Sequence, residues 1–161
     1  MAIREIMKKG EPCLTKKCHA VTNFDKKLFS LLDDMRETLL AANGVGLAAP
    51  QVGILRRVVL VWDVNREDSD RNPVIYELIN PELVEVSEET EDGTEGCLSV
   101  PGVYGYVERP VRVTVRAQNR KGEFYEVTGE GIVARCFCHE TEHLDGHLFT
   151  EKVTRYVEDD A

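Results

Sequence analysis

Apolar residues at helical spacing mark the first regular segment of this 161-residue chain. They recur at three- and four-residue intervals, with charged residues between them: Leu28, Leu31, Leu32, Met35 and Leu39. This period is typical of an amphipathic helix. Thr22, followed three residues later by Asp25, resembles a capping box, and Asn43-Gly44 is a stop signal. We therefore expect a helix between these signals, preceded by an extended arm over residues 1–22.

The middle of the chain has the short apolar or alternating stretches that are typical of β-strands. The expected strands are residues 57–64, 74–79, 83–86 and 111–116, the last turning through 119–122 into a hairpin partner at 124–127. A polar stretch over 63–72 and an acidic run over 88–92 are expected to be exposed loops.

A second helical segment, residues 134–147, contains His139-Glu140-x-x-His143. On a helix the two histidines are i and i+4, so both imidazoles project from one face and can hold one metal ion. Glu140 lies about 100° round the axis, close enough to take a proton from water at the metal without ligating it. Gly146 is a signal for the end of this helix. The alternative is a surface helix in which the two histidines have this spacing by chance. The chain has only four histidines, which makes a chance pair around a glutamate less favourable.

Together these elements predict one α+β domain over residues 1–161. We expect antiparallel sheets packed around a central C-terminal metal-binding helix, with the N-terminal helix on the outside.

The composition excludes some classes of binding partner. A net charge of −9 argues against a broad nucleic-acid or acidic-membrane footprint, and no apolar run is long enough to span a bilayer. The first residues lack an apolar signal region, and five cysteines form no paired framework. These features predict a cytoplasmic protein with reduced cysteines.

A catalytic metal site needs a third protein ligand and one open position. His147 follows Gly146 too closely for the spacing of a third histidine ligand, and Glu151 and Glu158 follow too soon to lie on another packed helix. The third ligand is therefore expected upstream of the histidine pair.

Cys97 is the best upstream candidate, because Gly96, Pro101 and Gly102 indicate a loop that presents its thiol. A thiolate with two imidazoles makes a tetrahedral site with one place open. A buried apolar role for this cysteine is the alternative. We favour packing roles for Cys136 and Cys138, and we expect Cys18 and His19 to be exposed or packed side chains rather than metal ligands.

A stretch of small residues over 44–53 lets another backbone approach closely, or makes a tight turn from helix to strand. Gln51 is a lone amide among its apolar neighbours and needs hydrogen-bond partners if buried. It either ties loops together or points a donor into the site.

Three stretches together resemble the signature motifs of bacterial-type peptide deformylases: Gly44-Val45-Gly46-Leu47-Ala48-Ala49-Pro50-Gln51, Glu95-Gly96-Cys97-Leu98-Ser99 and His139-Glu140-Thr141-Glu142-His143. The resemblance covers essentially the whole chain. It implies metal-dependent removal of the formyl group from N-formylmethionyl ends of nascent polypeptides, with release of formate. It also implies one divalent ion bound by Cys97, His139 and His143, with Fe²⁺ as the native ion and Zn²⁺, Ni²⁺ or Co²⁺ able to replace it.

The resemblance assigns further roles. Glu140 moves the proton, while the Gln51 amide and the Leu98 backbone N–H stabilise the oxyanion. Substrate backbone lies along Gly44, Val45 and Gly46 as an added strand. The methionine side chain of the substrate enters an apolar pocket. The candidates for its walls, chosen by their positions in the sequence, are Val45, Ile132 and Cys136. An arginine, here Arg109, pairs with Glu95.

Two departures from the family concern Cys138, where relatives often have glutamine, and the acidic end over residues 156–161 in place of a basic helix that docks on the ribosome. We therefore expect at most transient ribosome contact, no DNA or membrane partner, and a monomer. The remaining alternatives are a general zinc metallopeptidase and a non-catalytic metal-stabilised domain, whose fourth ligand would be Cys138 or His147.

Overall fold

The computed structural model describes residues 2–158, so residue 1 and residues 159–161 of the expected 1–161 domain lie outside the described part. Its helical elements are η1 (Pro12–Thr15), α1 (Lys26–Ala41), η2 (Ala49–Val52), α2 (Ile132–Leu144) and η3 (Phe149–Glu151), the η elements being single turns of 3-10 helix. No helix within residues 2–158 is long and apolar enough to cross a membrane.

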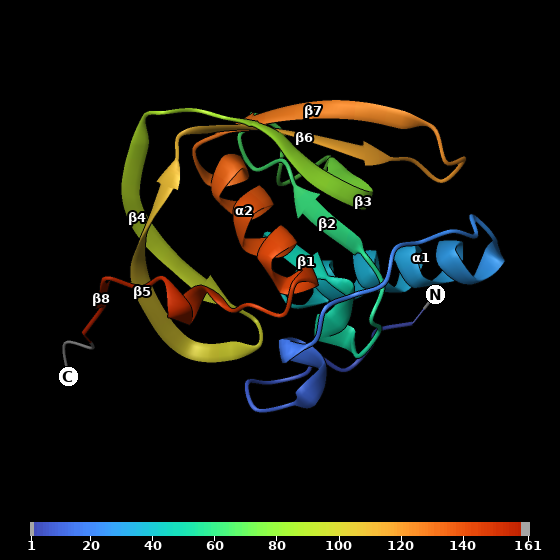
Figure 1. The fold of residues 1–161 in the computed structure, drawn as a ribbon, viewed down its shortest axis with the longest axis horizontal. Helices are drawn as coiled ribbons and strands as arrows, with labels where there is room; N and C mark the ends of the chain where they lie inside the picture. Colours follow the sequence, from blue (N-terminus) through green and yellow to red (C-terminus); the bar gives the residue numbers. More distant parts are fainter. Residues whose placement is uncertain (1, 159–161) are drawn as a thin grey trace.

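Two antiparallel sheets enclose α2, as Figure 1 shows, with β4 and β5 on one side of it and β2 and β3 on the other. The five-stranded sheet has the order β1-β2-β3-β6-β7 and comprises β1 (Gly46–Ala48), β2 (Val58–Trp62), β3 (Ile75–Val86), β6 (Arg112–Gln118) and β7 (Phe124–Glu130). The three-stranded sheet has the order β4-β5-β8 and comprises β4 (Thr90–Cys97), β5 (Val100–Pro110) and β8 (Arg155–Tyr156).

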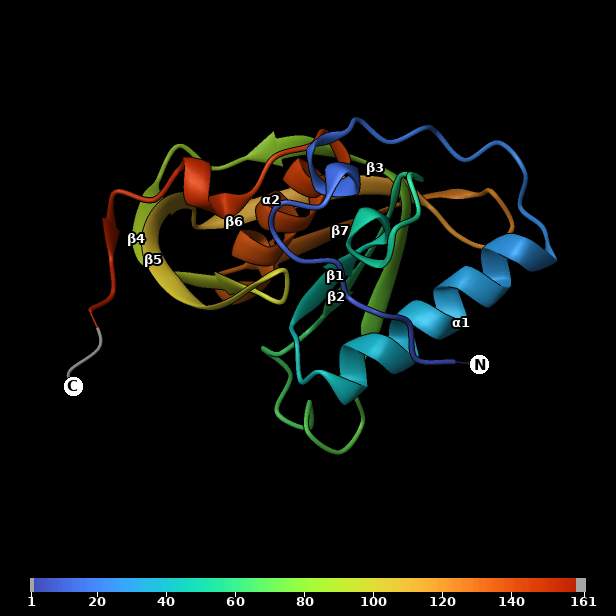
Figure 2. The same cartoon turned by 90° about the horizontal axis from the view of Figure 1, so that it is seen from below.

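The apolar run of β2 is explained by burial of both its faces. Val59 and Val61 pack in the core beneath α2, whereas Val58 and Leu60 pack in the core beneath α1. Successive side chains of a strand point to opposite faces, so a strand covered on both sides needs apolar residues throughout. Figure 2 shows α1 on the outside, across β1 and β2 from α2. The predicted fold class, with its central late helix and its outer early helix, is confirmed.

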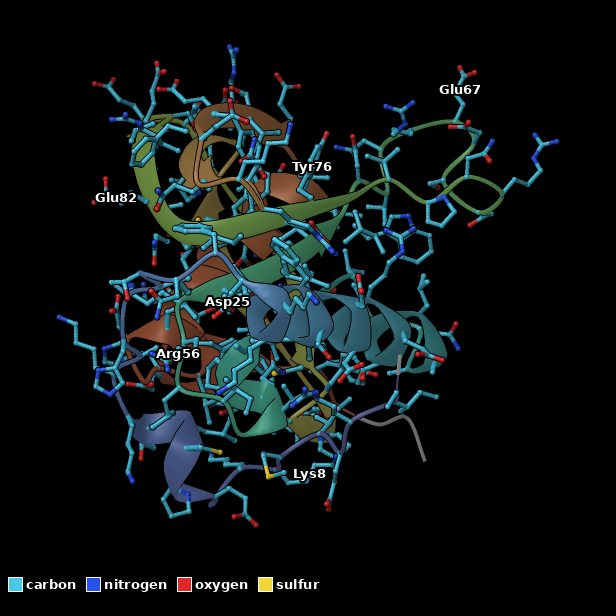
Figure 3. The ribbon with its side chains drawn as sticks, turned by 90° about the vertical axis from the view of Figure 1, so that its right-hand side faces the viewer. Lys8, Asp25, Arg56, Glu67, Tyr76 and Glu82 are labelled. Carbon is cyan, nitrogen blue, oxygen red and sulfur yellow. The ribbon has the colours of Figure 1, made fainter. Side chains whose placement is uncertain are left out.

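The start of α1 differs from the expected capping box. Asp25 itself is the N-cap, and its carboxylate accepts a hydrogen bond from the backbone N–H of Leu28 at 3.1 Å. Figure 3 shows Asp25 at the end of the helix. Thr22 is exposed and lies before the cap, so its expected role in the box is wrong. An N-cap residue satisfies an otherwise unpaired N–H of the first turn, and Asp25 does so alone.

The strand predictions also need correction. The expected strands at 74–79 and 83–86 are one continuous β3, because its ladder with β6 shifts register twice and absorbs Asn80, whose φ is +52°. The acidic run is no simple loop, since β4 begins at Thr90. The eleven-residue β5 was not predicted, because its mixed polar and apolar residues lack a clear two-residue period.

Candidate metal centre

The three residues expected to bind a metal converge. His139 and His143 lie one turn apart on α2, and Cys97 ends β4. Their potential ligand atoms all lie within 4.8 Å of one another, and Sγ of Cys97 is 3.5 Å from Nε2 of His143. Cys97 reaches this position through a break in the β4–β5 ladder, whose register shifts between Glu95 and Cys97. Such an irregularity redirects a side chain at the end of a strand.

The donor set fits a divalent ion. Burial and the neighbouring His139 hold the pKa of His143 well below its usual value, which keeps the imidazole neutral and its lone pair available. Oε1 of Glu95 lies 2.9 Å from Nδ1 of His139, so an N–H at Nδ1 leaves Nε2 free as a ligand. A soft sulfur with two imidazole nitrogens suits Fe²⁺, Zn²⁺ and related ions.

Glu95 is the anchor of the surrounding polar network. Arg109 donates to both of its carboxylate oxygens, at 2.8 and 3.0 Å, and Arg135 donates to one at 2.9 Å. Burial opposes ionisation of Glu95, but the hydrogen bonds from His139 and Arg109 outweigh it and lower its pKa to about 2. The expected pairing of Arg109 with Glu95 is present. Arg109 also donates to Glu142 at 2.7 Å, and Glu142 accepts from Lys152 at the surface.

Glu140 stands between the two imidazoles and the glycine-rich strand. Its carboxylate oxygens lie 4.0 Å from Nε2 of His139 and 3.9 Å from Nε2 of His143. It is 4% exposed, and its Oε1 has no hydrogen-bond partner among the described residues. Burial raises its pKa to about 7. A Cβ at Gly46 would lie 2.6 Å from this carboxylate, so the close approach requires glycine at that position.

The contacts of Gln51 agree with both interpretations from the sequence, a tie between loops and a donor directed into the site. Its Oε1 accepts a hydrogen bond from the Ala48 N–H, while its Nε2 points to Sγ of Cys97 at 3.5 Å and to Oγ of Ser99 at 3.2 Å. The amide is therefore oriented by one loop and directed at the other. Leu98 follows Cys97, and its side chain would lie 2.8 Å from a Cβ at Gly44.

A pocket of about 420 Å³ opens beside these residues. Its walls include every residue expected to contact substrate, from β1 and its approach and from α2: Gly44, Val45, Gly46, Ile132 and Cys136. Gln51, Cys97, Leu98, His139 and Glu140 line it as well. Ile132 is 55% exposed, so it forms the rim.

The competing ligands lie elsewhere. Cys138 packs in the apolar core with Leu144, where burial raises its pKa to about 11. His147 is exposed and contacts Glu151 at 3.2 Å. Neither belongs to the cluster formed by Cys97, His139 and His143. A structural site with four protein ligands therefore lacks its fourth ligand among residues 2–158.

Sequence reasoning missed Arg135 and Ser99. Arg135 lines the pocket and donates to the backbone carbonyls of Glu91 and Val107 as well as to Glu95. It lies four residues before His139 and therefore on the same face of α2, which was a usable signal. Ser99 is fully buried and accepts from Gln51, a contact between distant segments that no local pattern reveals.

Comparison with known proteins gives a consistent result. The family model described as polypeptide deformylase matches residues 3–158. A peptide deformylase 1 of Bacillus cereus is 52% identical over 159 residues, covering 99% of this chain and 97% of the relative. The crystal structure of the Thermotoga maritima peptide deformylase superposes with a TM-score of 0.85 at 40% identity, covering 96% and 99% of the two chains.

A class I type b peptide deformylase from Acinetobacter baumannii, solved with Met-Ala-Ser bound, is also similar, with a TM-score of 0.85 at 38% identity, covering 94% of this chain and 99% of that one. The family match spans nearly the whole chain, and the relatives agree with one another. This chain therefore belongs to the peptide deformylase family of metal-dependent hydrolases, which act on N-formyl amides.

Proposed function

We propose that Cys97, His139 and His143 hold one divalent ion with which this deformylase removes the formyl group from N-formylmethionyl peptides, and that Fe²⁺ is the physiological ion. The convergence of the three donors beside the Glu140 carboxylate is the observation that carries the proposal. When bound, the ion polarises the formyl carbonyl and brings the pKa of a water molecule toward neutrality. Zn²⁺, Ni²⁺ and Co²⁺ accept the same ligands.

Glu140 moves the proton in this proposal. Its Oε1, which has no hydrogen-bond partner among the described residues, lies 3.9 Å from Nε2 of His143, so a water molecule held beside the imidazoles would be within its reach. A carboxylate takes the proton of that water and, once protonated, returns it to the amine nitrogen that leaves. Burial favours this return, because it raises the pKa of Glu140 to about 7, whereas a bound cation favours the carboxylate that starts the cycle.

Gln51 and Leu98 stabilise the negative charge that develops on the formyl oxygen. The Nε2 group of Gln51 already points at the side of the site where Cys97 lies, and its orientation is held by the Ala48 N–H. The backbone N–H of Leu98, directly after the cysteine, is the second donor. Loss of one such donor in other hydrolases raises the barrier by about 2.7–4 kcal/mol.

The substrate peptide binds as an added strand. β1 is an edge strand whose one neighbour in the described sheet is β2, so its outer side can pair with an extended peptide. Gly44 and Val45, which lead into β1, and Gly46, which begins it, would line the peptide backbone, while Val45, Ile132 and Cys136 enclose the methionine side chain. The A. baumannii structure with Met-Ala-Ser bound supports a peptide that begins with methionine.

The expected setting is the cytoplasm, where a monomer acts on nascent chains. A net charge of −9 is unfavourable for extended contact with RNA, so we propose that any ribosome contact is transient. The same charge disfavours DNA and anionic membranes as partners.

Formate release tests the function. The metal-loaded chain should release formate from formyl-Met-Ala-Ser, and it should leave acetyl-Met-Ala-Ser and the internal amides of both peptides intact. A general metallopeptidase would instead cleave an internal bond, and that result would overturn the proposal.

A further inference from the structure

Two backbone groups of the N-terminal arm are bound to the two loops that carry Gln51 and Cys97. The N–H of Met7 donates to the carbonyl of Gln51 at 2.7 Å, and the N–H of Lys9 donates to the carbonyl of Ser99 at 2.8 Å. Gln51 belongs to η2, which joins β1 to β2 of the five-stranded sheet, whereas Ser99 lies in the turn between β4 and β5 of the other sheet. The arm therefore joins a connecting segment of one sheet to a turn of the other.

The spacing of the two donors explains why one short segment can reach both loops. Residues two apart in an extended chain direct their N–H groups to the same side, and the residue between them directs its own to the opposite side. Lys8 is the residue between them, and its N–H donates to no backbone carbonyl within residues 2–158. Figure 3 shows Lys8 on the outer side of the arm.

The loops joined in this way also meet through side chains. Nε2 of Gln51 lies 3.2 Å from Oγ of Ser99 and 3.5 Å from Sγ of Cys97. Gln51 and Ser99 are 1% and 0% exposed, so neither carbonyl can exchange its arm partner for bulk water without local opening. The Ala48 N–H orients the Gln51 amide, and the separation of the two segments sets how far its Nε2 lies from Cys97 and Ser99.

We propose that the N–H groups of Met7 and Lys9, here called the arm staple, are positioning groups for catalysis. They fix η2 and the β4–β5 turn at the separation at which Gln51 is directed toward the developing oxyanion. This inference rests on the proposed role of Gln51. The staple touches no substrate, so its effect passes through Gln51 and Ser99.

Proline substitutions test the staple, because proline removes the N–H donor. Lys9→Pro suits the backbone: Glu11 N–H donates to the Lys8 carbonyl and Gly10 has a φ of +106°, which closes a turn with residue 9 at its second position, where proline is favoured. Met7→Pro removes the other donor. Lys8→Pro is the matched control, since it places the same ring in the same segment without removing a staple bond.

The expected result is a split between kinetic constants. Lys9→Pro and Met7→Pro should each lower kcat about tenfold, within the range of up to about 100-fold that misplacement of a catalytic group costs, with the KM for formyl-Met-Ala-Ser and the metal content unchanged. Lys8→Pro should keep the kcat of the wild type. Equal kcat values for Lys9→Pro and Lys8→Pro would overturn the proposal.

A double-mutant cycle separates positioning from general destabilisation. Ser99→Ala removes the hydroxyl that accepts from Gln51. If the staple acts through this contact, Lys9→Pro should cost less kcat in the Ser99→Ala background than in the wild type. Equal fold losses in both backgrounds would contradict the proposal.

A readout independent of turnover keeps the staple testable if the proposed role of Gln51 fails. The Ala48 N–H is bound by Oε1 of Gln51, so its hydrogen exchange, followed by NMR on the metal-loaded chain, reports the order of that side chain. Lys9→Pro should accelerate this exchange several-fold while the amide of Leu32 in α1 is unaffected. Unchanged exchange at Ala48 would overturn the staple, whereas absent formate release by the wild type would overturn the proposed function.

Discussion

Oε1 of Glu95 lies 2.9 Å from Nδ1 of His139, and the same carboxylate accepts two hydrogen bonds from Arg109. Since Glu95 is ionised, with a pKa of about 2, it accepts the proton of Nδ1 and leaves Nε2 of His139 as the nitrogen that would face the proposed ion. Glu95 comes from β4 and His139 from α2, so this contact also joins the strand that carries Cys97 to the helix that carries both histidines.

Glu95→Gln should weaken both metal binding and the fold. The variant leaves Arg109 and Arg135 buried opposite a neutral amide, and loss of one partner of a buried ion pair costs about 3–5 kcal/mol. Loss of the partner that orients a metal-binding histidine typically reduces metal affinity about 10–100-fold. Competition with a chelator and urea unfolding measure the two effects. Glu91→Gln, with an exposed side chain on the same strand, is the control; equal affinities in the two variants would contradict this role of Glu95.

Gly46→Ala should reduce kcat while the metal is retained. The new Cβ would lie 2.6 Å from Oε2 and 2.8 Å from Cγ of Glu140, which is 4% exposed and has little room to move. The carboxylate must therefore shift from its place between the imidazoles, and a misplaced group of this kind costs up to about 100-fold in rate. Formate release and metal analysis on one sample measure both. A variant with the kcat of the wild type would show that this contact does not position Glu140.

Because Asp25 caps α1, its removal should lower the stability of the fold. Asp25→Ala should lower the free energy of unfolding by about 1 kcal/mol, because the N–H of Leu28 loses its cap. Thr22→Ala should change it by less than about 0.5 kcal/mol, as expected for an exposed residue outside the cap. Urea unfolding of both variants at one pH measures the two changes in the free energy of unfolding. Equal losses in the two variants would restore Thr22 to a capping role.

Asp34 links the start of the chain to α1 and predicts a pH dependence. Hydrogen bonds from the Ala2 N–H and from Arg4 hold the pKa of Asp34 below its usual value. The unfolded chain therefore binds this proton more readily, so the stabilisation is complete above the unfolded pKa of about 3.9 and is lost as the pH falls through the lower folded value.

Asp34→Asn removes the titrating group and is the control for this effect. The free energy of unfolding of the wild type should fall more steeply below about pH 4 than that of the variant, and the two should run parallel above it. Parallel curves across the acid range would show that the contact of Asp34 with Ala2 and Arg4 does not stabilise the charged form.

The features that sequence reasoning predicted correctly depend on local spacing. The histidine pair follows from the helical period alone, and the outer helix follows from its apolar stripe with Asn43 at φ +55° after its end. Cys97 was identified as a candidate because flanking glycine and proline indicate a turn, and it does lie at a strand end before the turn to β5.

The features that were missed depend on contacts between distant segments. β5 has no clear apolar period because its buried positions include Gly105 and Arg109, and β3 continues through bulges that only its pairing with β6 reveals. In the sequence, Arg135 is one charged residue of a helix. Its role depends on the backbone carbonyls of β4 and β5, which accept hydrogen bonds from its guanidinium. Tertiary contacts of this kind override local preference.

The proposed function requires that one sulfur and two imidazole nitrogens of this chain hold the ion and leave a position for water. X-ray absorption at the zinc edge of the Zn²⁺-loaded protein measures these ligands. We expect one sulfur at about 2.3 Å, two imidazole nitrogens at about 2.0–2.1 Å and one further oxygen, with the sulfur lost in Cys97→Ala. A spectrum with no sulfur, with two sulfurs, or with a sulfur that persists in Cys97→Ala would contradict it.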